Sequence, residues 1–245
     1  MPEDILHGWT NEIFASIQGE GLYCGQRQTF VRLAGCNLAC SYCDTALARE
    51  DTPPTCRIEQ APGEARFEEL PNRIGVETVV AACKRLGSEV ITLTGGEPLV
   101  QVEFVGHLLS RLQENGFTTH LETNGSLPSE LARVIQNVDV VAMDIKLPSA
   151  SGMNDLWEEH TLFLEIARRA AVFAKTVVSN ETTDEEMHRV ADLIAAVDAW
   201  IPLVIQPVSG EYMPGMRLIR LQEVASQTLD DVRVIPQCHK MLGIL

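Results

Sequence analysis

Three cysteines in one short stretch have the spacing of a metal-cluster site. Cys36, Cys40 and Cys43 follow the pattern C-x3-C-x2-C. Structural zinc sites close with four ligands, whereas iron–sulfur clusters are held by cysteine thiolates. Three thiolates on a 4Fe–4S cluster would leave one iron open for a small molecule. The spacing therefore favours such a cluster; the alternatives are zinc completed by a distant histidine, or three buried apolar cysteines.

The other cysteines and the net charge limit the class of protein. The chain of 245 residues has seven cysteines and a formal net charge of −15. An odd set with three packed together is typical of a reducing compartment, so we expect a cytoplasmic protein, with Cys24, Cys56, Cys83 and Cys238 in packing or surface positions. The negative charge argues against a nucleic-acid partner. No apolar run reaches the ~18 residues of a membrane span, and the N-terminal sequence is not that of a secretory signal.

Predicted strands and helices alternate along the chain. Strands are expected at 11–17, 29–34, 89–93, 118–121, 138–143, 171–178, 201–207 and 232–236, and helices at 76–86, 102–115, 127–134, 156–169, 184–197 and 218–226. This alternation predicts an α/β fold of parallel βαβ units, closing into a TIM-like (β/α) barrel or partial barrel with right-handed crossovers. We expect one domain over residues 1–245, with a loop-like surface excursion at about 46–75.

Polar residues follow five of the predicted strands, at 94–98, 122–124, 144–146, 179–180 and 206–209. The carboxyl ends of parallel strands share one edge, where the sites of α/β proteins are built. Backbone at Gly95 and Gly96 could lie against a ligand where a side chain would collide. Glu122 and Asn124 could pair with ribose hydroxyls or with an amino acid. Each segment alone is typical of a turn, but five in phase predict a site.

Two features near the start of the chain indicate a small anionic ligand. The sequence Gln18-Gly19-Glu20-Gly21 places two glycines around a carboxylate, as in a ligand-binding loop or in a plain turn. Arg32 lies in an apolar predicted strand, four residues before Cys36. A cation there needs an anionic partner, which is either a structural carboxylate or the substrate.

The cysteine pattern, with Tyr42 before the third cysteine, resembles the motif of radical S-adenosylmethionine (radical SAM) enzymes. The resemblance implies a radical SAM partial barrel with the cluster loop near the N-terminus. It also implies that the amino and carboxylate groups of SAM chelate the open iron, and that an electron from the cluster cleaves SAM to a 5′-deoxyadenosyl radical. A donor such as flavodoxin or ferredoxin would supply the electron.

Longer segments resemble the 7-carboxy-7-deazaguanine synthase family of queuosine-type (7-deazapurine) biosynthesis. They are residues 14–21, 30–38, 42–45, 92–98, 122–125 and 237–244. The resemblance implies hydrogen abstraction from C6 of 6-carboxy-5,6,7,8-tetrahydropterin, ring contraction, loss of ammonia and formation of 7-carboxy-7-deazaguanine. It further implies Mg²⁺ as a cofactor and a homodimer.

The resemblance also implies a role for each matching residue. Cys36, Cys40 and Cys43 would hold the cluster, and the Thr45 hydroxyl would bind Mg²⁺ unless it only caps the following turn. SAM would be lined by Tyr42, Cys43, Asp44, Gly96, Glu122, Asn124, Asp144, Ile145, Lys146, Gln206, Pro207, Val208 and Ser209. The pterin would be held by Ile17, Gln18, Gly19, Glu20, Arg32 and Thr94. The family often ends in a proline whose carboxylate reaches the substrate; here the last residue is Leu245, so this contact is left open.

Two other functions remain possible at this point. A glycyl-radical activating enzyme would share the cysteine motif but act on a partner protein, and Arg32 with residues 18–21 favours a small substrate instead. A non-catalytic iron–sulfur or zinc protein would not need the polar residues after the strands.

Overall fold

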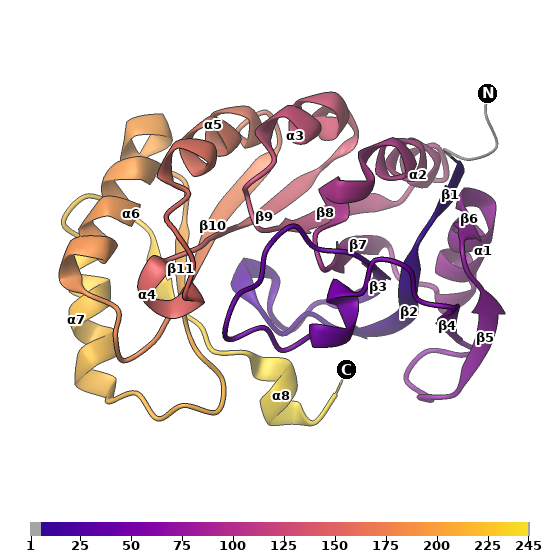
Figure 1. Cartoon of the computed structure of the whole chain (residues 1–245), viewed down its shortest axis with the longest axis horizontal. Helices are drawn as coiled ribbons and strands as arrows, with labels where there is room; N and C mark the ends of the chain where they lie inside the picture. The colour runs from indigo at the N-terminus through magenta and orange to yellow at the C-terminus, as the bar shows by residue number, and fades with distance from the viewer. Residues whose placement is uncertain (1–5, 245) are drawn as a thin grey trace.

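One continuous ten-stranded sheet forms the centre of the computed structural model, which describes residues 6–244 (Figure 1). Its parallel strands are β3 (Arg27–Leu33), β7 (Val90–Gly95), β8 (Thr118–Thr123), β9 (Val140–Ile145), β10 (Ala171–Val178), β11 (Leu203–Pro207) and β12 (Val232–Val234). The other three are β2 (Thr10–Ile17), antiparallel to β3, and the hairpin of β4 (Thr55–Glu59) and β5 (Phe67–Pro71). The strand order is β12-β11-β10-β9-β8-β7-β3-β2-β4-β5.

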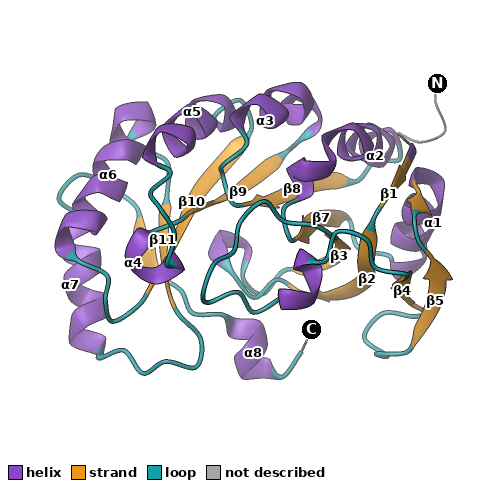
Figure 2. Cartoon of the chain, viewed as in Figure 1, coloured by secondary structure: helices purple, strands orange, loops and turns teal. Residues whose placement is uncertain are grey.

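Helices connect successive parallel strands and lie along the outer side of the curved sheet (Figure 2). They are α1 (Val76–Leu86), α2 (Val102–Glu114), α3 (Pro128–Val134), α5 (Trp157–Ala167), α6 (Asp184–Asp198) and α7 (Gly215–Ala225). Shorter elements are β1 (His7–Gly8), which pairs with β6 (Ile74–Gly75), then α4 (Pro148–Ser151), α8 (Cys238–Leu242), and the 3-10 helices η2 (Gly21–Tyr23), η3 (Ala46–Arg49), η4 (Pro98–Gln101) and η5 (Ile135–Asn137).

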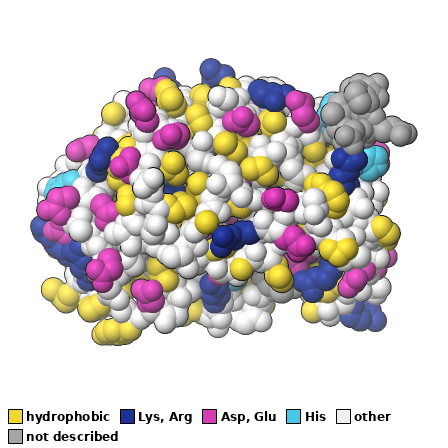
Figure 3. Space-filling model, viewed as in Figure 1, with side chains coloured by type: hydrophobic (Ala, Val, Ile, Leu, Met, Phe, Trp, Pro, Cys, Tyr) yellow, Lys and Arg dark blue, Asp and Glu magenta, His cyan; other side chains and the backbone are white. Residues whose placement is uncertain are grey.

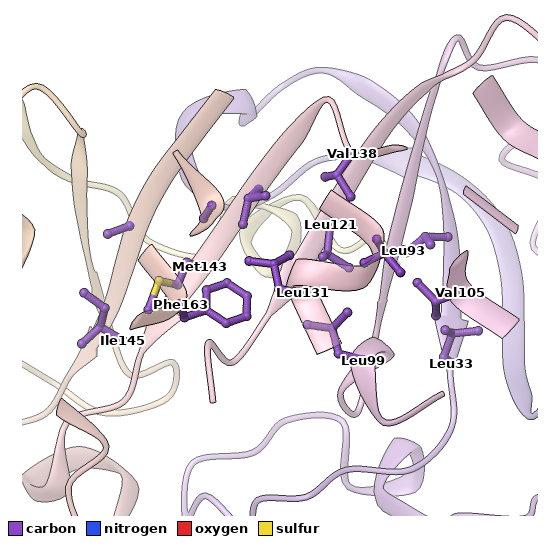
Figure 4. Close-up of a cluster of buried hydrophobic side chains, with 14 of the residues drawn as sticks. Leu33, Leu93, Leu99, Val105, Leu121, Leu131, Val138, Met143, Ile145 and Phe163 are labelled. Carbon is purple, nitrogen blue, oxygen red and sulfur yellow. The ribbon is translucent and has the colours of Figure 1, made fainter. Parts of the chain in front are cut away.

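The main hydrophobic core lies between the sheet and these helices. Strand residues such as Leu93, Leu121 and Met143 pack with Leu131 of α3 and Phe163 of α5 (Figure 4). All five side chains are fully buried, and each contributes roughly 1.5–3 kcal/mol by leaving water. The opposite face of the parallel strands carries a smaller buried cluster of Val140, Ala142, Phe173 and Val204, together with polar residues near the strand ends.

The predicted alternation of strands and helices is confirmed from residue 76 onward, and α1 and β10 have the predicted bounds. The α/β fold class is also confirmed, as a partial barrel, because the two ends of the sheet do not meet. No helix in the described part of the chain is long and apolar enough to cross a membrane. On the face shown in Figure 3, acidic and basic side chains are interspersed.

The prediction of a loop-like surface excursion over residues 46–75 is wrong for residues 55–59 and 67–71, which form strands. This segment supplies β4, which pairs with β2, and β5, which forms the edge of the sheet. Cys56 and Ile58 are buried, and the intervening Arg57 is exposed. This alternation is typical of a half-buried strand, but the surrounding prolines and charges masked it in the sequence.

Candidate active site

A cavity of about 280 Å³ lies at the carboxyl ends of the parallel strands. Nearly all of the predicted site residues line it: Ile17, Gln18, Gly19, Glu20, Arg32, Cys36, Cys40, Tyr42, Cys43, Asp44, Thr45, Thr94, Gly96, Glu122, Asn124, Asp144, Lys146, Gln206, Pro207, Val208 and Ser209. The fold therefore brings the cluster loop, the strand ends and residues 17–20 to one place.

Two predicted residues do not join this set. The Ile145 side chain is completely buried in the core between the sheet and the helices. Successive residues of a strand point to opposite faces, so Asp144 lines the cavity while Ile145 faces the helices. Ile145 could therefore meet a ligand only through its backbone, and its predicted contact with SAM stays a prediction. Leu245 lies outside the described residues.

The three motif cysteines suit a multi-iron cluster better than a single zinc ion. Cys36, Cys40 and Cys43 are free thiols, half-buried at the cavity wall. Three possible metal-ligand atoms lie within 4.8 Å of one another at Glu20, Asp44 and His239 of the described chain. The three thiols do not form such a close set. Sulfurs on one tetrahedral zinc, bound at ~2.3 Å, would lie closer together than that limit. Burial raises the pKa of Cys36 and Cys40, so the thiols need a metal to deprotonate them.

A close approach between two backbone segments fixes the start of the cluster loop, residues 36–43, which carries the three motif cysteines. A Cβ on Gly96 would lie 2.1 Å from the Gly35 carbonyl oxygen and 2.6 Å from that of Ala48. The Glu97 N–H donates to the Gly35 carbonyl at 2.8 Å. The sequence predicted that a side chain at Gly96 would collide with a ligand, whereas the structure shows that it would collide with the chain itself. At the far end of the loop, Ser41 donates to the carbonyls of Ala150 and Ser151.

Glu97 holds the turn that carries Asn124. Its carboxylate accepts from the Asn124 N–H at 2.7 Å, the Thr123 hydroxyl at 2.9 Å and the Leu99 N–H at 3.0 Å. Burial raises the pKa of Glu97 to about 7, against the opposing effect of the three donors. The Asn124 side chain in turn donates to Asn37 at 2.9 Å, so Glu97 indirectly positions the cluster loop.

We expect Glu97→Gln to lower both the free energy of unfolding and the affinity for SAM. The amide nitrogen of Gln would face a donor, leaving a buried N–H unsatisfied at a cost of about 1–3 kcal/mol. Chemical unfolding and SAM titration would measure the two losses. Glu103→Gln, at an exposed residue of α2 paired with Arg133, is the matched control. Unchanged unfolding and SAM affinity in Glu97→Gln would show that these hydrogen bonds do not hold the turn.

Two buried oxygens in the cavity wall have no partner among the described residues. They are Asp144 Oδ1 and Gln206 Oε1, both on residues predicted to bind SAM. Asp144 Oδ2 is occupied, since Lys146 binds it at 2.9 Å, and Lys146 also donates to the Tyr42 hydroxyl at 3.2 Å. Buried acceptors are costly unless paired. The amino, ribose and adenine donors of SAM would satisfy them, so these residues fit that cofactor.

Arg32 has a structural partner and a free end. Its Nε donates to Glu12 at 2.9 Å, and Glu12 also pairs with Arg57. The terminal Nη atoms of Arg32 have no hydrogen-bond partner in the described chain, and the residue lines the cavity. The structure shows the first of the two alternatives that the sequence left open, a structural carboxylate. The terminal Nη atoms are left for a second anion.

Gln18, one of the residues predicted to hold the pterin, is hydrogen-bonded to Glu122, which is predicted to line SAM. Gln18 donates to Glu122 at 2.8 Å and to Gln28 at 3.1 Å. Phe14 and Phe30 stack at 5.3 Å between ring centroids and also line the cavity. They give this side an apolar wall that suits a flat heterocycle.

Sequence reasoning assigned no role to several residues that meet in the cavity. Gln237 donates to Glu20 at 2.6 Å and to Asp44 at 2.8 Å, joining residues more than 190 positions apart. Lys240 pairs with Asp44 at 2.7 Å. Burial alone would raise the pKa of Asp44, but these hydrogen bonds hold it well below its usual value. Figure 1 shows α8, which follows Gln237, next to the loop after β3.

Lys175 was also missed, although the sequence contained an indication of it. It is the single charged residue of the apolar strand β10, and the reasoning applied to Arg32 applies equally there. Gly21, Gly95 and Thr123, which belong to segments that the sequence predicted at the site, also line the cavity. The remaining residues of the wall, to which the sequence reasoning gave no role, are Phe14, Phe30, Leu38, Arg49, Ala142, Phe173, Val177 and His239.

Comparison with known proteins agrees with this geometry. The radical SAM superfamily profile matches residues 30–194. A 7-carboxy-7-deazaguanine synthase of Geobacter sulfurreducens is 42% identical over 244 residues, covering 96% of both chains. One of Methanopyrus kandleri is 38% identical, covering 96% of this chain and 93% of its own. The chain belongs to the 7-carboxy-7-deazaguanine synthase family of the radical SAM superfamily.

Solved structures support the same fold at lower sequence identity. QueE from Escherichia coli superposes with a TM-score of 0.63 at 22% identity, covering 95% of each chain. A structure of TYW1 with a lysine–pyruvate adduct bound gives 0.55 at 15% identity, covering 82% of this chain and 74% of that one. The resemblance in the sequence to the synthase family is thus confirmed, and the protein is a radical SAM enzyme rather than a non-catalytic metal-binding protein.

Proposed function

We propose that this protein converts 6-carboxy-5,6,7,8-tetrahydropterin to 7-carboxy-7-deazaguanine with loss of ammonia. The observation that carries the proposal is that three groups of residues line one cavity. They are the three thiols, the unpartnered oxygens of Asp144 and Gln206, and the free end of Arg32. The curated relatives that share nearly the whole chain are named for this product.

In this proposal Cys36, Cys40 and Cys43 hold a 4Fe–4S cluster, and SAM lies along Asp144, Lys146 and Gln206. When bound, the cluster and SAM supply the carbon-centred radical that takes a hydrogen atom from C6 of the pterin. The protein's own contribution is to orient the pterin, to compensate its charge and to exclude water.

The residues at the start of the chain orient the pterin. The free Nη atoms of Arg32 bind the C6 carboxylate, and the carboxylate of Glu20 accepts hydrogen bonds from the N–H groups of the pyrimidine ring. Phe14 and Phe30 cover one side of the cavity. Burial alone would raise the pKa of Glu20, but Lys175 lowers it below the usual value, so Glu20 is an ionised acceptor at neutral pH.

Thr45 is the proposed protein ligand of Mg²⁺, which would neutralise the substrate carboxylate. It occupies the position before η3, but its hydroxyl makes no capping hydrogen bond to the backbone. It donates instead to Asp44 at 3.0 Å. Mg²⁺ keeps several waters and takes few protein ligands beside its substrate, so one hydroxyl is sufficient in this proposal.

We expect Thr45→Ala to raise the Mg²⁺ concentration needed for half-maximal turnover about tenfold, with cluster content unchanged. A lost oxygen ligand weakens Mg²⁺ binding without affecting the thiols. Thr45→Ser keeps the hydroxyl and should behave like the parent. An identical Mg²⁺ titration for Thr45→Ala and the parent would place the ion elsewhere.

The reaction itself is tested by anaerobic reconstitution. The protein should take up about four irons per chain. With SAM, Mg²⁺ and a reductant it should release ammonia and 7-carboxy-7-deazaguanine from the pterin, in equal amounts. Cluster formation and SAM cleavage without this product would contradict the proposal. The proposal also includes a flavodoxin- or ferredoxin-like electron donor, a cytoplasmic location and a homodimer, the last of which sedimentation would test.

A further inference from the structure

Lys175 lies between two carboxylates in the wall of the cavity. Its side chain is 16% exposed and forms ion pairs with Glu20 and, at 3.4 Å, with Asp144. Burial alone would lower the pKa of this lysine, but the two carboxylates raise it well above its ordinary value. Lys175 is therefore a permanent positive charge shared by two acids.

The two acids face different ligands of the proposed reaction. Glu20 belongs to the segment at residues 17–20 that would hold the pterin, and Asp144 lies near the carboxyl end of β9, among the residues that would hold SAM. Asp144 Oδ2 is shared by Lys146 and Lys175, and its Oδ1 is buried without a partner in the described chain. Asp144 thus has one oxygen without a partner in the described chain and one in contact with Lys175.

Charge balance makes this arrangement responsive to a cationic ligand. Lys146 and Lys175 balance Asp144 and Glu20 in the protein alone. SAM carries a positive sulfonium group, while its amino and carboxylate groups would be bound to the open iron. When such a cation pairs with Asp144, it partly neutralises the charge of this carboxylate and also repels Lys175. Both effects favour the contact between Lys175 and Glu20.

We propose that Lys175 is a positioning residue that couples SAM binding to pterin binding. SAM at Asp144 leaves Lys175 paired with Glu20, and Glu20 is then held in the place where it accepts from the pterin. By linkage, the pterin strengthens SAM binding by the same factor. This inference rests on the proposed function for the identity of the two ligands.

Equilibrium binding tests the coupling without turnover. We would titrate 6-carboxy-5,6,7,8-tetrahydropterin into the anaerobically reconstituted protein by calorimetry, with and without saturating SAM and with no reductant present. In the parent we expect SAM to tighten pterin binding about tenfold, which is within the usual range for coupled sites. In Lys175→Met we expect the ratio of the two affinities to approach one, at unchanged iron content.

Several variants separate coupling from structural damage. Lys175→Arg keeps the charge and should retain most of the coupling. Lys84→Met removes an exposed lysine of α1 and should match the parent. Lys175→Met leaves two buried carboxylates short of a counter-ion, so Lys175→Met combined with Glu20→Gln replaces it if it does not fold. That pair should also show a ratio near one.

A parental ratio in either methionine variant, or no coupling in the parent, would overturn the inference. Product formation by the parent is measured separately. A parent that makes product without coupling would refute only the role of Lys175. A parent that binds the pterin with coupling but makes no product would refute the proposed function instead.

Discussion

Replacing Cys40 with alanine is expected to abolish SAM cleavage and the formation of product. Two thiolates cannot hold a 4Fe–4S cluster with one iron left open for SAM, so iron content should fall well below four per chain. Cys36→Ala and Cys43→Ala should have the same effect. Iron analysis, the visible spectrum and chromatography of SAM products would each report it.

The control for these variants is Cys24→Ala. Cys24 is an exposed free thiol and does not line the cavity, so this variant should keep the cluster and its activity. Cys56 and Cys83 also lie away from the cavity, but both are fully buried, and alanine there would leave a small void that lowers stability. Normal turnover by the Cys40→Ala protein would remove the basis for the cluster assignment.

Replacing Arg32 with lysine is expected to raise the KM for the pterin by about 10- to 100-fold. Hydrogen bonds to charged groups are worth about 1.5–3 kcal/mol, and lysine keeps the charge but cannot reproduce the planar fork that binds a carboxylate through two donors. Iron content and SAM affinity should stay near the parental values, because Arg32 contacts Glu12 and not the cluster loop. Steady-state kinetics would measure the change.

Arg57→Lys is the matched control for Arg32→Lys. Arg57 pairs with the same carboxylate, Glu12, but is half exposed and does not line the cavity. If the KM rose equally in both variants, the effect would come from the Glu12 ion pairs. A parental KM in Arg32→Lys would make Arg32 a structural residue.

The sequence by itself determined the chemistry of the site and most of the fold. The spacing of Cys36, Cys40 and Cys43 is local, so a short loop suffices to bring them together. The polar residues near the ends of five strands, such as Glu122 and Asn124, could also be predicted to lie close together without the structure, because parallel strands end at a common edge. The bounds of α1 and β10 could be predicted from their apolar periodicity, because this pattern depends only on residues that are close in sequence.

The tertiary structure decided which distant residues meet. Whether residues 55–71 form a hairpin depended on an edge offered by β2, and this edge is not encoded near residue 55. Lys175 and Gln237 both contact Glu20, from positions 155 and 217 residues away. Ion pairs and hydrogen bonds of this kind depend on the path of the backbone between their partners. Residue type can show that a buried charge needs a partner, but only the folded chain determines which partner it has.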